Sequence, residues 1–92
     1  MQRMSVRFEG HVQGVGFRYS AVECSKAFDL TGYVRNERDG SVYLVAEGDE
    51  DDLNGFLQAV RHSGVGRFVT KESMSWEPAT GEFNSFGVGY GP

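Results

Sequence analysis

The stretch MSVRFEGHVQGVGFR, residues 4–18, changes its pattern of side chains twice, and these changes decide how the chain is expected to fold. In residues 4–11 apolar and polar side chains alternate, with Met4, Val6 and Phe8 on one side, as in a strand that buries one face. Residues 10–16 then include three glycines, which predict a tight loop with backbone conformations that other residues rarely adopt.

Beyond this loop the apolar residues return at helical spacing. They recur at steps of four, three and four, which predicts one apolar stripe along a helix of about three turns. The helix is expected to end near Asp29. The residues of the stripe are Phe17, Ala21, Cys24 and Phe28.

Two short runs rich in strand-forming residues, 33–36 and 41–47, come next. The pair Asp39-Gly40 lies between them, and such a pair is a strong hairpin signal because it accepts the backbone conformations of a tight turn. The two runs are therefore expected to be antiparallel neighbours in a sheet.

A second helix is predicted to start after Asp49, which is a good residue for the N-cap. Asp52 follows three residues later, as in a capping box, and the acidic cluster 49–52 suits the positive end of a helix dipole. The apolar residues of this helix fall on one face, which is expected to pack onto the sheet. They are Leu53, Phe56, Leu57 and Val60.

Residues 69–77 and 83–90 are predicted to form the last two strands, with a turn between them. The order of elements is then βαββαβ plus a final strand. This order predicts an α+β protein, a ferredoxin-like α/β sandwich with an antiparallel sheet of four to five strands and two helices on one face. Residues 1–92 are expected to form a single domain, because the chain has room for only one core.

Composition excludes several classes of function. The net charge is −4 and no run of Lys or Arg is present, so nucleic-acid binding is not expected. The N-terminal residues lack the apolar stretch of a signal peptide or membrane span, which favours a cytoplasmic protein that binds no membrane. The single cysteine, Cys24, has no partner for an internal disulfide.

The glycine loop is the best candidate for a site, because backbone N–H groups in such a loop and at the following helix N-terminus can bind an anion. Arg18 stands at the start of that helix, and its guanidinium can bind two oxygens of a phosphate. The same residues would also suit a plain turn. A Walker loop is absent, and Tyr19 occupies the position of the third glycine in a dinucleotide-binding fingerprint.

Nucleophilic and metal chemistry receive no support from the spacing of residues. A cysteine phosphatase needs an arginine six residues after its cysteine, but that position after Cys24 is Leu30, so Cys24 is interpreted as a core residue. His11 and His62 have no partner at the spacing of metal ligands, and we predict no metal site.

Two longer motifs make the interpretation specific. Residues 10–19, GHVQGVGFRY, resemble one signature of the acylphosphatase family, and residues 32–42, GYVRNERDGSV, are similar to the other signature at the expected distance. The flanking elements match in order from about residue 5 to residue 90. Without its motif, Asn36 would be interpreted as a residue at the end of a strand or in a turn.

The resemblance implies roles for individual residues. Arg18 matches the phosphate-binding arginine, and Asn36 matches the asparagine that orients the nucleophilic water. The implied reaction is hydrolysis of the carboxyl-phosphate bond of an acyl phosphate, without metal or cofactor, with inorganic phosphate as product and competitive inhibitor. The loop that wraps the substrate phosphate comprises Gln13, Gly14, Val15, Gly16, Phe17 and Arg18.

Two other functions are compatible with the broad topology. One is a non-catalytic domain that binds phosphate or a phosphorylated partner, against which the presence of both Arg18 and Asn36 argues. The other is an RNA-recognition module, which the sequence of residues 41–46 and the net charge disfavour. No motif encodes a pocket for the acyl group, so broad acceptance of acyl groups is expected, and a monomer is the simplest expectation.

Overall fold

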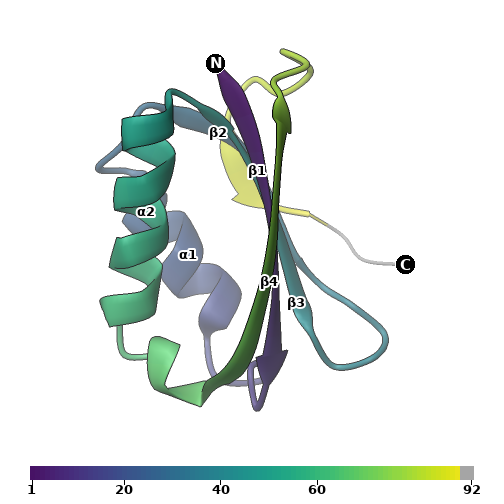
Figure 1. Cartoon of the computed structure of the whole chain (residues 1–92). Coiled ribbons are helices and arrows are strands. Elements are labelled where there is room, and N and C mark those ends of the chain that lie inside the picture. The colour runs from purple at the N-terminus through teal and green to yellow at the C-terminus, as the bar shows by residue number, and fades with distance from the viewer. Residues whose placement is uncertain (90–92) are drawn as a thin grey trace.

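The computed structural model describes residues 1–89, in which two helices cover one face of a five-stranded sheet (Figure 1). The order of elements confirms the predicted βαββαβ pattern with a final strand. The elements are β1 (Gln2–Gly10), α1 (Phe17–Ser25), β2 (Leu30–Asn36), β3 (Val42–Gly48), α2 (Glu50–His62), the 3-10 helix η1 (Gly66–Phe68), β4 (Val69–Pro78) and β5 (Phe86–Val88).

The strand order in the sheet is β4-β1-β3-β2-β5. The pairs β1–β3, β1–β4 and β2–β3 are antiparallel, as expected, and the hairpin around Asp39-Gly40 is confirmed. The last strand differs from the prediction, because β5 is parallel to β2. The reason is geometric: β2 runs opposite to β4, and the chain reverses after β4 before it reaches the far edge of the sheet.

The final strand is also shorter than expected. Only Phe86–Val88 form β5, where they lie opposite Gly32, Tyr33 and Val34. Residues 83–85 precede the strand, and the predicted end at Tyr90 lies outside the described residues.

The core lies between the sheet and the helices, as the alternation in β1 predicted. Met4, Val6 and Phe8 are each 0% exposed. The rings of Phe8 and Phe17 have centroids 4.9 Å apart, which joins the first strand to the start of α1. Cys24 is half-buried and packs against this core. From α2 the buried residues are the predicted Leu53, Phe56, Leu57 and Val60.

Both helices differ in detail from the prediction. Helix α1 ends at Ser25, so Phe28 lies beyond it, although the Phe28 ring still packs near Phe56 at a centroid distance of 6.4 Å. Asp49 does occupy the N-cap of α2, but its side chain makes no capping hydrogen bond, so the predicted capping box is wrong. Asp49 is exposed, and water competes for its carboxylate. Asp52 is shorter than the Glu or Gln that completes a capping box.

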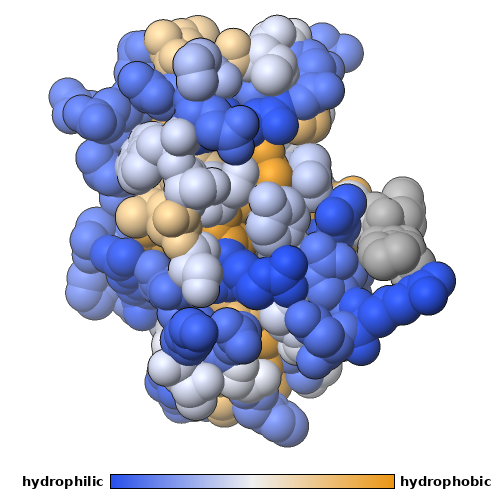
Figure 2. All heavy atoms as spheres, turned by 45° about the vertical axis from the view of Figure 1, so that its right-hand side comes forward, coloured by the Kyte–Doolittle hydropathy of each residue, from blue (hydrophilic) through white to orange (hydrophobic). Residues whose placement is uncertain are grey.

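Hydrophilic side chains predominate on the face of the molecule shown in Figure 2, where hydrophobic atoms are visible mainly between them. In the described part of the chain, no helix is long and apolar enough to cross a membrane. A few large apolar side chains are nevertheless exposed, namely Met1, Tyr19, Met74, Trp76 and Val88.

Gly32 in β2 permits a close approach of β2 to β3. Its φ is 144°, and an added Cβ would collide with the carbonyl group of Val45. We expect Gly32→Ala to lower the free energy of unfolding by about 3 kcal/mol, from backbone strain together with the clash. Urea unfolding at neutral pH measures this change.

Gly64→Ala is the matched control, since Gly64 has no left-handed φ and an added Cβ would meet nothing within 4 Å. We expect this substitution to change the free energy of unfolding by less than about 1 kcal/mol. Equal effects of the two substitutions would contradict the role of the close approach at Gly32.

Candidate active site

The loop between β1 and α1 owes its shape to two glycines. Gly14 and Gly16 have φ values of 79° and 84°, in the left-handed region that other residues avoid. An added Cβ would meet nothing within 4 Å at either position. Backbone conformation, and not crowding, is therefore what requires glycine here.

The N–H groups of this loop are available to a ligand. Within the described part of the chain, none of the backbone N–H groups of residues 13–18 donates a hydrogen bond to another protein group. Gly16 is the N-cap of α1 and provides no side chain to cap the helix. Because the positive end of the helix dipole lies at the same place, the loop and helix start form a candidate anion site.

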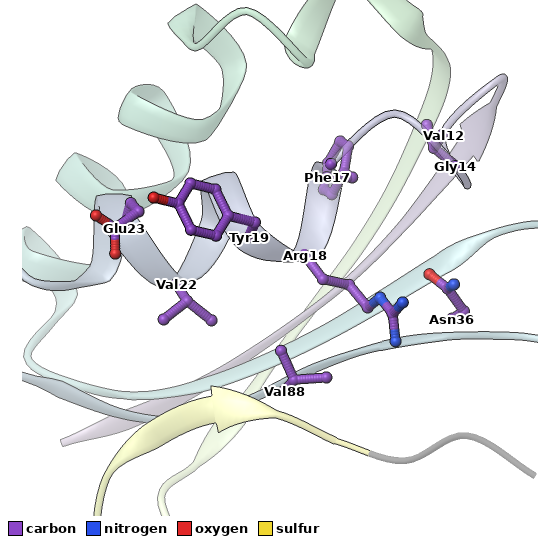
Figure 3. A pocket seen from close by; sticks show the side chains of 10 residues that line it. Val12, Gly14, Phe17, Arg18, Tyr19, Val22, Glu23, Asn36 and Val88 are labelled. Atoms are coloured by element: carbon purple, nitrogen blue, oxygen red, sulfur yellow. The ribbon is translucent and has the colours of Figure 1, made fainter.

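Arg18 and Asn36 line one pocket together with this loop. Arg18 lies in the first turn of α1, and Asn36 is the last residue of β2. Figure 3 shows the Arg18 side chain extending toward the Asn36 amide. Both residues are half-buried. The tertiary structure therefore brings together the two residues that the sequence singled out.

Other residues of the predicted loop have different positions. Gly14, Gly16 and Phe17 line the pocket, whereas the side chains of Gln13 and Val15 are directed elsewhere. Val15 packs against the core. The Gln13 side-chain amide donates to the carbonyl oxygens of Glu37 at 2.7 Å and Ser41 at 2.9 Å. A role of Gln13 toward an anion is thus left to its backbone N–H group.

The hairpin turn that carries Asn36 is held by its own hydrogen bonds. The N–H of Glu37 donates to the Ser41 carbonyl at 2.8 Å, directly after Asn36. The Asp39 carboxylate accepts from the Ser41 hydroxyl at 2.6 Å and from the Ser41 N–H at 2.9 Å, and these bonds lower the pKa of Asp39. Gly40 has a φ of 95°, as a tight turn at Asp39-Gly40 requires.

A buried carboxylate, Glu47 of β3, holds the segment that follows β4. Glu47 is only 3% exposed. It accepts hydrogen bonds from Arg3 Nε at 2.8 Å, the N–H of Thr80 at 2.9 Å, the Thr80 hydroxyl at 3.0 Å and the N–H of Gly81 at 2.9 Å. Arg3 also pairs with Glu82. This cluster is not evident from the sequence, because alternation along β3 places Glu47 on a face that would otherwise be open to water.

The charge of Glu47 is stabilised by these donors. Burial by itself raises the pKa of the carboxyl group, but the hydrogen bonds from Thr80, Arg3 and Gly81 outweigh it and lower the pKa from 4.5 to about 2. Glu47 therefore remains ionised in the folded protein over the whole neutral range.

Strand β5 supplies a pocket wall that the sequence did not reveal. Val88, at the end of β5, lines the same pocket as Arg18 and Asn36. The segment held by Glu47 precedes β5 in the chain, so this anchor restricts where β5 can pair. The only signal in the sequence is a valine within a predicted strand. Such valines are common, so this signal does not identify Val88 as a pocket residue.

Three other candidate groups, Cys24, His11 and His62, do not line this pocket. Burial raises the pKa of the Cys24 thiol, which makes it a weaker nucleophile at neutral pH. His62 Nδ1 lies 2.9 Å from the Gln58 carbonyl oxygen, and the His11 ring lies against Phe68. Among residues 1–89 there is no group of three or more His, Cys, Asp or Glu side chains that could hold a metal ion.

A mixed sheet with two helices on one face, together with a glycine loop whose N–H groups and arginine meet at a pocket, defines the class: a small α+β protein with a candidate anion site. Comparison with known proteins is more specific. Residues 4–88 match the family model described as Acylphosphatase. The chain belongs to the acylphosphatase family, whose name denotes enzymes that hydrolyse acyl phosphates.

Relatives agree over nearly the whole length of the chain. It is 41% identical to an acylphosphatase of Salinibacter ruber over 95% of this chain and 92% of the relative. It is 43% identical to one of an Arthrobacter species over 96% of this chain and 81% of the relative. The crystal structure of acylphosphatase from Bacillus subtilis is similar with a TM-score of 0.88 and 33% identity, covering 98% of this chain and all of that one.

The pKa of Glu47 predicts a pH-dependent contribution to stability. Because the folded-state pKa lies below the ordinary value, this contribution is complete above about pH 4.5 and is lost as the pH falls through about 2. We expect Glu47→Gln to lower the free energy of unfolding by about 2–3 kcal/mol at neutral pH. Urea unfolding at several pH values should show this difference shrinking below about pH 4.

Glu82→Gln is the matched control, since Glu82 pairs with the same Arg3 but its side chain is 54% exposed. We expect a change of less than about 1 kcal/mol, with little dependence on pH. A difference between wild type and Glu47→Gln that stayed constant down to acid pH would contradict the ionised state of Glu47.

Proposed function

We propose that this chain hydrolyses acyl phosphates in the pocket between the start of α1 and the end of β2. The N–H groups of residues 13–18 and the Arg18 guanidinium bind the phosphoryl oxygens, and Asn36 orients the attacking water. The observation that carries this proposal is the group of unpaired backbone N–H groups beside Arg18 and Asn36.

The proposed reaction needs mainly positioning and charge stabilisation. The water oxygen attacks phosphorus, the bond from phosphorus to the bridging acyl oxygen breaks, and that oxygen leaves with the carboxylate. Negative charge on the transferring oxygens is stabilised by fixed N–H dipoles and one permanent cation. The Asn36 side chain can hold the water by hydrogen bonds, and the proton of the water passes to a phosphoryl oxygen of the substrate.

This chemistry requires no protein nucleophile and no strong general acid. A carboxylate is a good leaving group, so it departs without protonation by the enzyme. The half-buried Cys24 thiol therefore has no role in the reaction. Arg18 and the loop N–H groups supply the positive potential that a metal ion supplies in other phosphoryl-transfer enzymes, so we propose metal-independent hydrolysis without a cofactor.

We also propose that residues 1–92 act as a single acylphosphatase domain and as a cytoplasmic monomer. In support of one domain, a single cluster of buried residues joins both helices to the sheet. In support of the cytoplasm, the one cysteine is a free thiol, which suits a reducing compartment. Inorganic phosphate, as the product, should compete with the substrate for Arg18 and the loop.

The purified protein is expected to hydrolyse benzoyl phosphate in the presence of EDTA, at a rate that added Mg²⁺ does not raise. Loss of the absorbance of benzoyl phosphate measures this reaction. A folded protein that binds phosphate but leaves benzoyl phosphate intact would instead be a non-catalytic anion-binding domain.

Substitution should separate the roles of the two polar residues. Arg18→Ala removes a charged donor from the bound phosphate, so the inhibition constant of phosphate should rise about 10- to 100-fold while kcat/KM falls about 100-fold or more. Asn36→Ala should lower kcat about 100-fold through loss of water positioning, with little change in the inhibition constant.

Lys71→Ala is the matched control for charge, because Lys71 is an exposed cation on the edge strand β4. Its kinetic constants should stay within about twofold of wild type, since exposed charges at a distance are screened. Full kcat in Asn36→Ala would exclude its proposed role, and an unchanged inhibition constant in Arg18→Ala would exclude phosphate binding by that guanidinium.

A further inference from the structure

We propose that the outer part of the active-site pocket is an acyl subsite that favours apolar, uncharged acyl groups, aromatic ones in particular. This inference rests on the proposed function, because the phosphate must first be held by Arg18 and the loop. The walls of the proposed subsite are Tyr19 and Val22 of α1 and Val88 of β5, and Glu23 forms the far end of the subsite.

The pocket is larger than a phosphate group needs. Its volume is about 430 Å³, within the range of small-molecule sites. The glycine loop, Arg18 and Asn36 line one part of it, and the remaining space is bounded chiefly by apolar side chains. An acyl group joined to the bound phosphate must extend into that remaining space or into solvent.

The spacing along α1 places the apolar wall within reach of the acyl group. Val22 follows Arg18 by four residues, so both lie on the same face of the helix, about 6 Å apart along its axis. An acyl group that extends several atoms beyond the bridging oxygen can therefore reach Val22. Val88 borders the same space from β5, on the opposite side of the pocket from the helix (Figure 3).

Exposure of the wall residues also points to a ligand. Tyr19 is 71% exposed and Val88 is 43% exposed. They are two of the five large apolar side chains exposed among the described residues, and both line this one pocket. Covering such exposed apolar surface with an apolar group removes it from water and lowers the free energy of the complex.

Charge around the subsite disfavours an anionic acyl group. Arg18 is the only cation among the residues that line the described pocket, and the phosphate engages it. At the far end lies the Glu23 carboxylate, which already pairs with Lys26 at 2.6 Å on the helix surface. A second negative charge on the acyl group would thus lie near the Glu23 carboxylate, and no second cation lines the pocket to pair with it.

The test compares benzoyl phosphate with acetyl phosphate, which share the phosphate but differ in the group that would fill the subsite. Tyr19→Ala removes the aromatic wall, and Val88→Thr makes the opposite wall polar without changing its shape. Each should lower kcat/KM for benzoyl phosphate about 3- to 10-fold relative to acetyl phosphate. The inhibition constant of inorganic phosphate should stay unchanged in both variants.

Trp76→Ala is the matched control, because Trp76 is an exposed aromatic residue that does not line this pocket. It should leave the ratio of the two substrates unchanged. An unchanged ratio in Tyr19→Ala and Val88→Thr, or an equal loss on both substrates, would overturn the subsite while leaving the proposed function intact. Failure of the wild-type protein to hydrolyse either substrate would overturn the proposed function instead.

Two further measurements complete the test. Benzoylphosphonate and acetylphosphonate lack the cleavable bond, so their dissociation constants can be measured by calorimetry without turnover. The ratio of the two affinities should change in the variants in the same direction as the ratio of the kcat/KM values. The wild-type protein should also hydrolyse 4-carboxybenzoyl phosphate less efficiently than benzoyl phosphate, by about threefold or more. Equal or higher efficiency with the carboxylated substrate would overturn the preference for uncharged acyl groups.

Discussion

The site depends on two hydrogen bonds from the Gln13 side chain to the hairpin turn, at 2.7 and 2.9 Å. Their acceptors are the carbonyl oxygens of Glu37 and Ser41, so the glycine loop is attached beside the end of β2 that carries Asn36. Gly14 and Gly16 then turn the chain so that its N–H groups remain unpaired. The same constraint explains how a loop without internal backbone bonds keeps a defined shape.

Glu47 plays a comparable part for the segment between β4 and β5. A buried carboxylate is costly unless it is paired, and here Arg3, Thr80 and Gly81 satisfy it. These contacts tie the chain after β4 to the sheet, and β5 then pairs with β2 and brings Val88 to the pocket. A residue distant from Arg18 thus helps to position one wall of the pocket that Arg18 lines.

Much of the fold was predictable because its signals are local. The alternation in residues 4–11 and the apolar face of α2 were confirmed, as was the turn at Asp39-Gly40. Predictions from local sequence were wrong where contacts with residues distant in the chain determine the structure. The Asp49 side chain makes no capping bond, α1 ends before Phe28, and the short β5 is parallel to its neighbour, since its direction follows from the path of the whole chain.

For the candidate site, the sequence by itself determined the residues: the glycines, Arg18 and Asn36 lie within two recognisable motifs because backbone conformation and residue chemistry are short-range properties. Only the tertiary structure decided how these motifs meet and what surrounds them. Glu47 and Thr80 are 33 residues apart in the chain, and Val88 is farther still from Arg18. Contacts over such separations depend on packing of the complete fold, which no local pattern encodes.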